Sequence, residues 1–197
     1  APTNSVRYDS PSFGGFSVSA SWGEDDFWDV AARYAGEWAD FKVAAAAAYS
    51  QTNSSSGNSA NVLQPFDTGY FQVGAYVEHM PTGLFAYGAY GNLNFHDSSA
   101  SSNQTWYGKA GIRQRWNPLG HTVLYGEYER IENRNGGDIY ANGAGPDTDT
   151  PDLLYGYDKA SARLWGVGVV QEIDSAAMSL WLKYRNIDAS FKGVELE

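Results

Sequence analysis

The sequence of 197 residues contains no cysteine, and none of its hydrophobic runs approaches the length of a membrane helix. Without cysteine, a disulfide scaffold and a thiolate metal site are both excluded. A transmembrane helix needs about 20 consecutive apolar residues, so any membrane span in this chain must be built from strands. Basic residues are also few: 13 Lys and Arg against 23 Asp and Glu give a formal net charge of −10. This acidic balance argues against nucleic acid as a partner.

Motifs of catalysis and metal binding are equally scarce. Neither H-E-x-x-H nor G-x-S-x-G occurs, and the three histidines lie singly at the ends of expected strands. We therefore predict no enzymatic activity and no cofactor. Asp147, Asp149 and Asp152 could ligate Ca²⁺ through their carboxylates, but their spacing is not that of an EF-hand loop. A solvated turn is the preferred interpretation of these three residues.

Period-two alternation of side chains is the strongest pattern present, and residues 104–130 show it best. Trp106 and Ile112 fall on one parity, and Lys109 and Arg113 fall on the other. Successive side chains of a strand point to opposite faces, so this pattern predicts a hairpin with one apolar and one charged face. Two interpretations fit: a soluble sheet with its apolar face in a core, or a membrane barrel with its charged face in the lumen.

About ten such strands are expected along the chain. The alanine run at 44–48 could favour a helix, but Phe41, Val43 and Tyr49 share one parity across it, so we predict a strand. Every odd-numbered connection is short, and the even-numbered ones include every long loop, such as 51–66 and 131–158; only 23–26 is a short even-numbered one. One rim of the sheet is therefore expected to carry short turns and the other to carry the long loops, which is the pattern of a transmembrane barrel.

Aromatic residues are abundant, with 14 Tyr and 7 Trp, and those of the apolar parity stand near strand ends. A globular core would place its largest side chains in mid-strand, whereas membrane barrels carry aromatic girdles at both interfaces. We predict that the girdles consist of Trp22, Trp28, Phe41, Tyr49, Phe71, Phe85, Phe95, Trp106, Tyr128 and Tyr184.

Charged residues of the polar parity are the candidates for the wall of a channel. They are mostly basic although the chain is acidic, and both parities are apolar around residues 163–170, so the faces there are open. The alternative for each charge is an ordinary solvated side chain. The predicted pore-lining residues are Arg7, Asp29, Arg33, Lys42, Glu78, Lys109, Arg113, Arg115, Glu127, Glu129, Arg163, Lys183 and Arg185.

Two segments resemble the general porins of alphaproteobacteria. These are N-S-V-R-Y-D-S-P-S-F-G-G-F-S-V-S-A-S-W-G-E-D-D-F-W-D-V-A-A-R-Y-A-G-E-W at 4–38 and G-V-G-V-V-Q-E-I-D-S-A-A-M-S-L-W-L-K-Y-R-N at 166–186. The resemblance implies a 16-stranded, homotrimeric barrel in the outer membrane, surrounded by lipid and lipopolysaccharide, that passes small hydrophilic solutes and ions. The competing hypothesis from another class is a soluble, lectin-like β-sandwich that binds carbohydrate.

The sequence departs from that family in length, in the lack of a final strand ending in Phe, and in the lack of an acidic constriction loop. We therefore expect residues 1–197 to be a single up-and-down transmembrane β-barrel domain that is incomplete at both ends. A complete ten-stranded barrel with a narrow lumen is the alternative.

Overall fold

The computed structural model describes residues 4–23, 27–52, 67–95, 102–133, 137–140 and 153–193. The fold is all-β. A single turn of 3-10 helix, η2 (Asp174–Ala176), precedes the last strand. The strands are β1 (Ser5–Asp9), β2 (Phe16–Gly23), β3 (Trp28–Trp38), β4 (Phe41–Thr52), β5 (Thr68–His79), β6 (Leu84–Phe95), β7 (Asn103–Asn117), β8 (Gly120–Asn133), β9 (Gly137–Tyr140), β10 (Leu153–Ile173) and β11 (Met178–Gly193). None of the described residues forms a helix that is long and apolar enough to cross a membrane.

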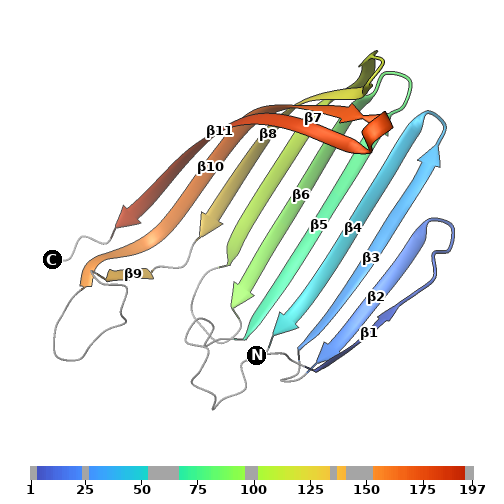
Figure 1. Ribbon diagram of the computed structural model, residues 1–197. Coiled ribbons are helices and arrows are strands. Elements are labelled where there is room, and N and C mark those ends of the chain that lie inside the picture. Colours follow the sequence, from blue (N-terminus) through green and yellow to red (C-terminus); the bar gives the residue numbers. More distant parts are fainter. Residues whose placement is uncertain are drawn as a thin grey trace.

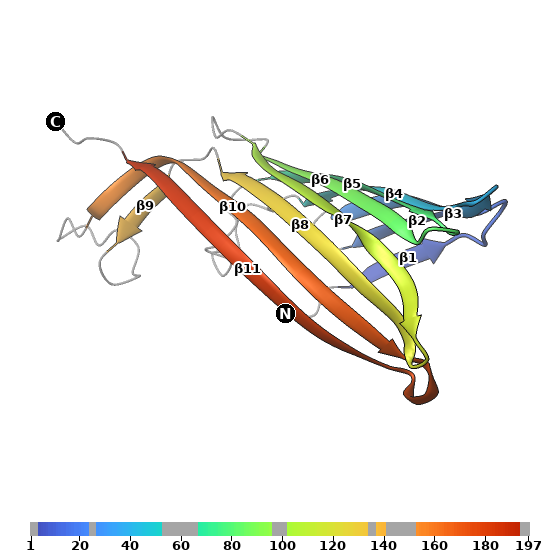
Figure 2. The ribbon, with the colours of Figure 1, turned by 90° about the horizontal axis from the view of Figure 1, so that it is seen from above.

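All strands belong to one antiparallel sheet in which neighbours in the sequence lie side by side (Figure 1). The order is β1-β2-β3-β4-β5-β6-β7-β8-β10-β11, and β9 pairs with β10 beside this path. The sheet is curved rather than flat (Figure 2). β1 and β11 stand at its two edges. The predicted up-and-down arrangement of about ten antiparallel strands is thus confirmed.

The predicted long loop at 131–158 was partly wrong. β9 lies inside it, and β10 begins at Leu153 and runs for 21 residues. The two strands pair with each other between Gly137 and Tyr157. For β9 and residues 153–156 of β10, only this pairing makes a strand, because the Gly, Asn and Asp content of the segment is that of a loop.

The alanine run lies in β4, where the prediction of a strand is confirmed. Alanine favours helix by only some tenths of a kcal/mol per residue. β4 is hydrogen-bonded along its length to β3 on one side and to β5 on the other, so Ala44 lies between Ala35 and Tyr76. Two complete ladders outweigh the local preference of the residues.

The described residues form almost no interior. Ala31 is their only buried apolar residue, and no large side chain among them is fully buried. Val18, Val30, Val73 and Leu180 are 52%, 45%, 39% and 58% exposed. A two-layer sandwich would bury these side chains between its sheets. The structure therefore does not support the soluble lectin-like alternative.

The connections after β1, β3, β5, β7 and β10 are all short and lie at one end of the sheet, which we call the turn rim (Figure 1). The opposite end is the loop rim. At the turn rim, Gly83 has a φ of 64° and packs tightly on β7, because a Cβ at Gly83 would lie 1.9 Å from the carbonyl oxygen of Arg113. Gly88, in mid-β6, has nothing within 4 Å of the same position.

We predict that Gly83→Ala destabilises the folded sheet, by about 1–3 kcal/mol from the left-handed backbone alone. The clash with β7 adds to this cost. The measurement is the temperature at which the folded protein in detergent changes its mobility on an electrophoresis gel. Gly88→Ala is the matched control and should leave that temperature nearly unchanged. An equal effect of both variants would contradict the role given to the turn.

Candidate pore wall

The register of the strands divides the side chains into two faces. Residues directly opposite each other in an antiparallel pair lie on the same side of the sheet. The polar face carries Arg33 and Lys109, and the apolar face carries Val18, Trp106 and Leu182. The polar face and the apolar face are thus the two sides of the whole sheet.

An ion-pair network occupies the middle of the polar face. Arg185 Nε on β11 donates to Glu127 Oε1 on β8 at 2.5 Å, and the Tyr107 hydroxyl on β7 donates to Glu127 Oε2 at 2.7 Å. The Glu127 side chain is only 1% exposed. Arg185 reaches it across Gly166 of β10, where a Cβ would lie 3.0 Å from Arg185 Cγ. The glycine therefore makes room for the ion pair.

A second network lies at the turn rim. Arg113 Nε and Nη2 on β7 donate to the two oxygens of Glu172 on β10, at 3.0 and 2.7 Å. Arg115 donates to Asp174 in η2. The network joins the ends of β7 and β10, and it includes two acidic residues that the sequence did not single out.

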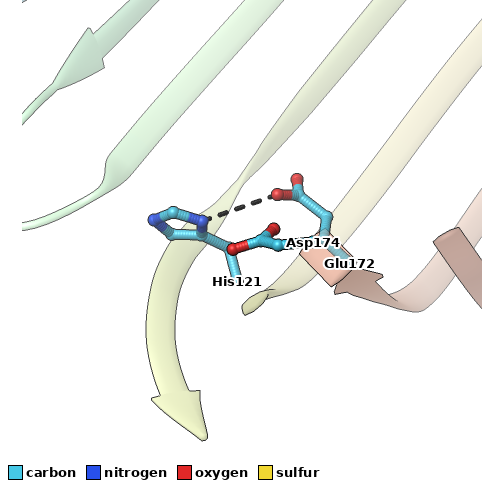
Figure 3. A group of neighbouring side chains, drawn as sticks. All are labelled: His121, Glu172 and Asp174. Atoms are coloured by element: carbon cyan, nitrogen blue, oxygen red, sulfur yellow. Dashed lines mark ion pairs between the residues drawn. The ribbon is translucent and has the colours of Figure 1, made fainter. Parts of the chain in front are cut away.

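His121 of β8 adjoins the same two carboxylates (Figure 3). His121 Nδ1 lies 3.5 Å from Glu172 Oε2, and the ligand atoms of His121, Glu172 and Asp174 are all within 4.8 Å of one another. Among the described residues, this is the only such group that could hold a metal ion. Both carboxylates already bind guanidinium groups, so we interpret the group as part of the ion-pair network.

The first strands carry smaller polar groups on the same face. The Ser21 hydroxyl donates to Asp29, and Arg33 Nη1 donates to the Ser19 hydroxyl at 2.9 Å. Arg7 forms an exposed ion pair with Asp9. Among the described residues, Arg33 is in hydrogen-bonding contact with no carboxylate.

One predicted wall residue was assigned to the wrong face. Arg163 pairs with Arg130 of β8 and Asp188 of β11, so it shares the apolar face with Trp165 and Val167. The residues around it are apolar on both parities, and Gly166 and Gly168 have no side chain. The local alternation therefore does not show which parity belongs to the apolar face. Only the register with β8 decides the face. The other predicted wall residues lie on the polar face or, for Arg115, in the network at the turn rim.

Tyrosines line much of the polar face, which was not predicted from the sequence. Tyr70, Tyr76, Tyr87, Tyr107 and Tyr125 stand there on four adjacent strands. The parity of Glu78 and Lys109 already carried the signal for Tyr70, Tyr76, Tyr107 and Tyr125. In β6 both parities are apolar or aromatic, so Tyr87 could be placed only by its pairing with Lys109.

The same register corrects the position of one predicted girdle residue. Phe85 pairs with Glu78 and its ring lies 5.9 Å from that of Tyr76, so it belongs to the polar face. Phe95 pairs with Thr68, but its side chain lies outside the described residues, as do Asp147, Asp149 and Asp152. The predicted girdle residues on the apolar face are Trp22, Trp28, Phe41, Tyr49, Phe71, Trp106, Tyr128 and Tyr184.

Two aromatic residues that the prediction missed complete the row towards the loop rim. The ring centroids of Tyr90 and Trp106 are 4.3 Å apart, and those of Trp165 and Tyr184 are 5.7 Å apart. Trp28 and Tyr49 are in similar contact, at 5.3 Å. A role of this row as a membrane girdle stays a prediction.

The sequence can also be compared with known protein families and structures. A family model described as Gram-negative porin matches residues 1–193. No curated protein and no solved structure gives a significant match.

We predict that Arg185→Gln lowers the thermal stability of the folded protein by several degrees, because it leaves the buried Glu127 carboxylate without its cation. The double variant Arg185→Gln/Glu127→Gln should recover part of the loss, since it removes the charge as well. Gel mobility on heating measures both. Losses that simply add up would show that the two side chains are not coupled.

Proposed function

Since the chain belongs to the Gram-negative porin family of the bacterial outer membrane, we propose that it lines an aqueous channel through which small hydrophilic solutes and ions diffuse. The family is one of channels rather than enzymes. A diffusion channel needs no bond chemistry: its function rests on an open lumen and on the charges of its wall. The proposal concerns the channel's solutes, its selectivity and its assembly.

The division of one sheet into a polar and an apolar face is the observation that carries this proposal. Backbone groups in hydrocarbon must be paired within the protein, and the ladders of this sheet pair them. Phe41 and Tyr49 lie near opposite ends of β4 on the apolar face, and eight residues at about 3.3 Å each separate them by about 26 Å. Strands of outer-membrane barrels tilt by about 35–45°, so this separation corresponds to roughly 18–22 Å of height, most of an apolar band that is about 25 Å tall.

The apolar face changes character beyond the row of aromatics towards the loop rim. Arg130 follows Tyr128 by two residues on β8, and Arg163 precedes Trp165 by two residues on β10. Two residues correspond to about 7 Å. We propose that these guanidinium groups stand among the head groups of lipid or lipopolysaccharide, with the aromatic rings at the boundary of the hydrocarbon.

The edges of the sheet suggest how the channel closes. β1 and β11 stand at opposite ends of the strand order, and no pairing joins them among the described residues. An unpaired edge cannot face lipid. We propose that both edges pair with further strands of a larger barrel, and that the barrel assembles as a homotrimer, as the resemblance implies.

Charge balance along the wall sets the expected selectivity. Arg113, Arg115 and Arg185 are each paired with a carboxylate, so their fields are largely cancelled. Lys109 lies over the Tyr125 ring and Lys183 over the Trp181 ring. We propose that these lysines and Arg33, rather than the paired arginines, make the wall attractive to anions.

We predict that Lys109→Glu/Lys183→Glu shifts the reversal potential of the channel several millivolts towards cation selectivity, measured in planar bilayers under a KCl gradient. The reason is the change of sign in the field of the wall. Arg163→Glu is the control: it makes the same kind of charge reversal on the apolar face and should leave the reversal potential unchanged. A larger shift from Arg163→Glu than from the lysine variant would contradict the proposed wall.

Neighbouring alanines of β4 test which face meets lipid. We predict that Ala45→Arg, at the middle of the apolar face, costs about 2–4 kcal/mol in a bilayer. Ala44→Arg, on the polar face, should cost far less because its guanidinium stays in water. Refolding yield in liposomes, titrated with urea, measures the difference. Equal yields for the two variants would contradict the assignment of lipid to the apolar face.

A further inference from the structure

A groove on the polar face has features that simple passage of ions does not require. It is a cavity of about 630 Å³ that extends from β3 to β7. Its floor includes the alanines of β4, and its lining includes Arg33, Tyr70, Tyr76, Tyr87 and Tyr107. We call this cavity the tyrosine groove. The small floor residues leave open the space that the tyrosine rings border.

Two of the rings lie down along the wall. A Cβ at Gly91 would meet the Tyr70 hydroxyl at 2.8 Å, and a Cβ at Gly74 would meet the Tyr87 hydroxyl at 3.0 Å. Each ring therefore extends over a glycine of the neighbouring strand, where any side chain would push it away. Each ring thus leans along the sheet rather than straight out from it, and the Tyr87 ring also contacts that of Tyr107, with centroids 5.8 Å apart.

Tyr125, outside the groove, shows what such a ring can bind. Its ring covers Gly168, where a Cβ would lie 2.4 Å from the hydroxyl. The Lys109 ammonium sits over the ring, 4.3 Å from its centroid. The ring face of a tyrosine held in this way is thus accessible to a neighbour. Tyr70 and Tyr87 lie over glycines in the same way.

Some polar groups of the groove are already engaged, and the lining also includes Gln72 and Thr105. The Tyr76 hydroxyl donates to Glu78 at 2.9 Å, and the Tyr107 hydroxyl donates to Glu127. Arg33 is exposed and donates one of its five N–H groups to Ser19. Its remaining donors can form a charge-assisted, bidentate contact with a carboxylate. The groove is therefore bordered by tyrosine rings on β5, β6 and β7 and, on the side of β3, by the Arg33 guanidinium, which is held towards Ser19 of β2.

From these contacts we infer that the tyrosine groove is a binding subsite for small aromatic carboxylates. The flat ring of such a solute would pack against Tyr70 and Tyr87, and its carboxylate would bind Arg33. Aromatic pairs gain energy beyond the burial of area, and the guanidinium group selects the anion. This inference rests on the proposed function, since the groove must face the lumen.

Benzoate is the probe for the test. In planar bilayers we expect benzoate to reduce the KCl conductance of the channel in a saturable manner at millimolar concentration. Acetate, which lacks the ring, and benzyl alcohol, which lacks the charge, should do so at least tenfold more weakly. Arg33→Gln and Tyr70→Ala/Tyr87→Ala should each weaken the block by benzoate about tenfold. Tyr128→Ala, which removes a tyrosine from the apolar face, should leave the block unchanged.

Calorimetric titration of benzoate into the protein in detergent separates this inference from the proposed function. Binding that Arg33→Gln weakens would support the subsite, whatever the conductance. A protein that conducts KCl but binds benzoate no better than acetate would overturn the subsite and leave the channel standing. A block by benzyl alcohol or glucose as strong as that by benzoate would also overturn it. Absence of any KCl conductance would overturn the channel alone.

Discussion

Backbone hydrogen bonding in the ladder is the constraint on which the rest of this structure depends. Each strand pairs with its neighbours residue by residue, and this pairing decides for every side chain which of two faces it occupies. A slip of one residue would bring Lys109 to the side of Trp106. The sheet has no packed core that could correct such an error, since Ala31 is the only buried apolar residue described. The register therefore carries both the stability of the sheet and its function.

Glycines give the polar face its shape. Gly166 lets Arg185 reach Glu127 across a strand, and Gly91 and Gly74 let two tyrosine rings lie along the wall. Glycine in a strand is costly in conformational entropy, so its use here has to be offset by what it admits. What it admits are the ion pair of the wall and the flat rings of the tyrosine groove. The charged network and the aromatic surface thus both depend on glycines in the strands of the polar face.

Much of the fold could be predicted because period two is a local property of a strand. Strong alternation in β2, β7 and β8 placed their faces correctly, and the parity across the alanine run identified β4 as a strand against its helix propensity. The errors share a cause. Arg163 and Phe85 lie in strands whose two parities are both apolar, so the local pattern had no phase there. The carboxylate partners of the wall arginines were missed because Glu172 and Asp174 lie 59 residues from them in the sequence.

The sequence by itself determined the all-β class, the alternating short connections, most faces of the strands and, through family membership, the place in the outer membrane. The fold class and the faces follow from a local property, because residues two apart in a strand point to the same side of the sheet. The tertiary structure alone decided the face of Arg163, the existence of β9 and the pairing of the wall arginines. It also brought Arg33 and the tyrosines of three further strands to one groove. These contacts join residues that are distant along the chain, and only the pairing of the strands brings such residues together.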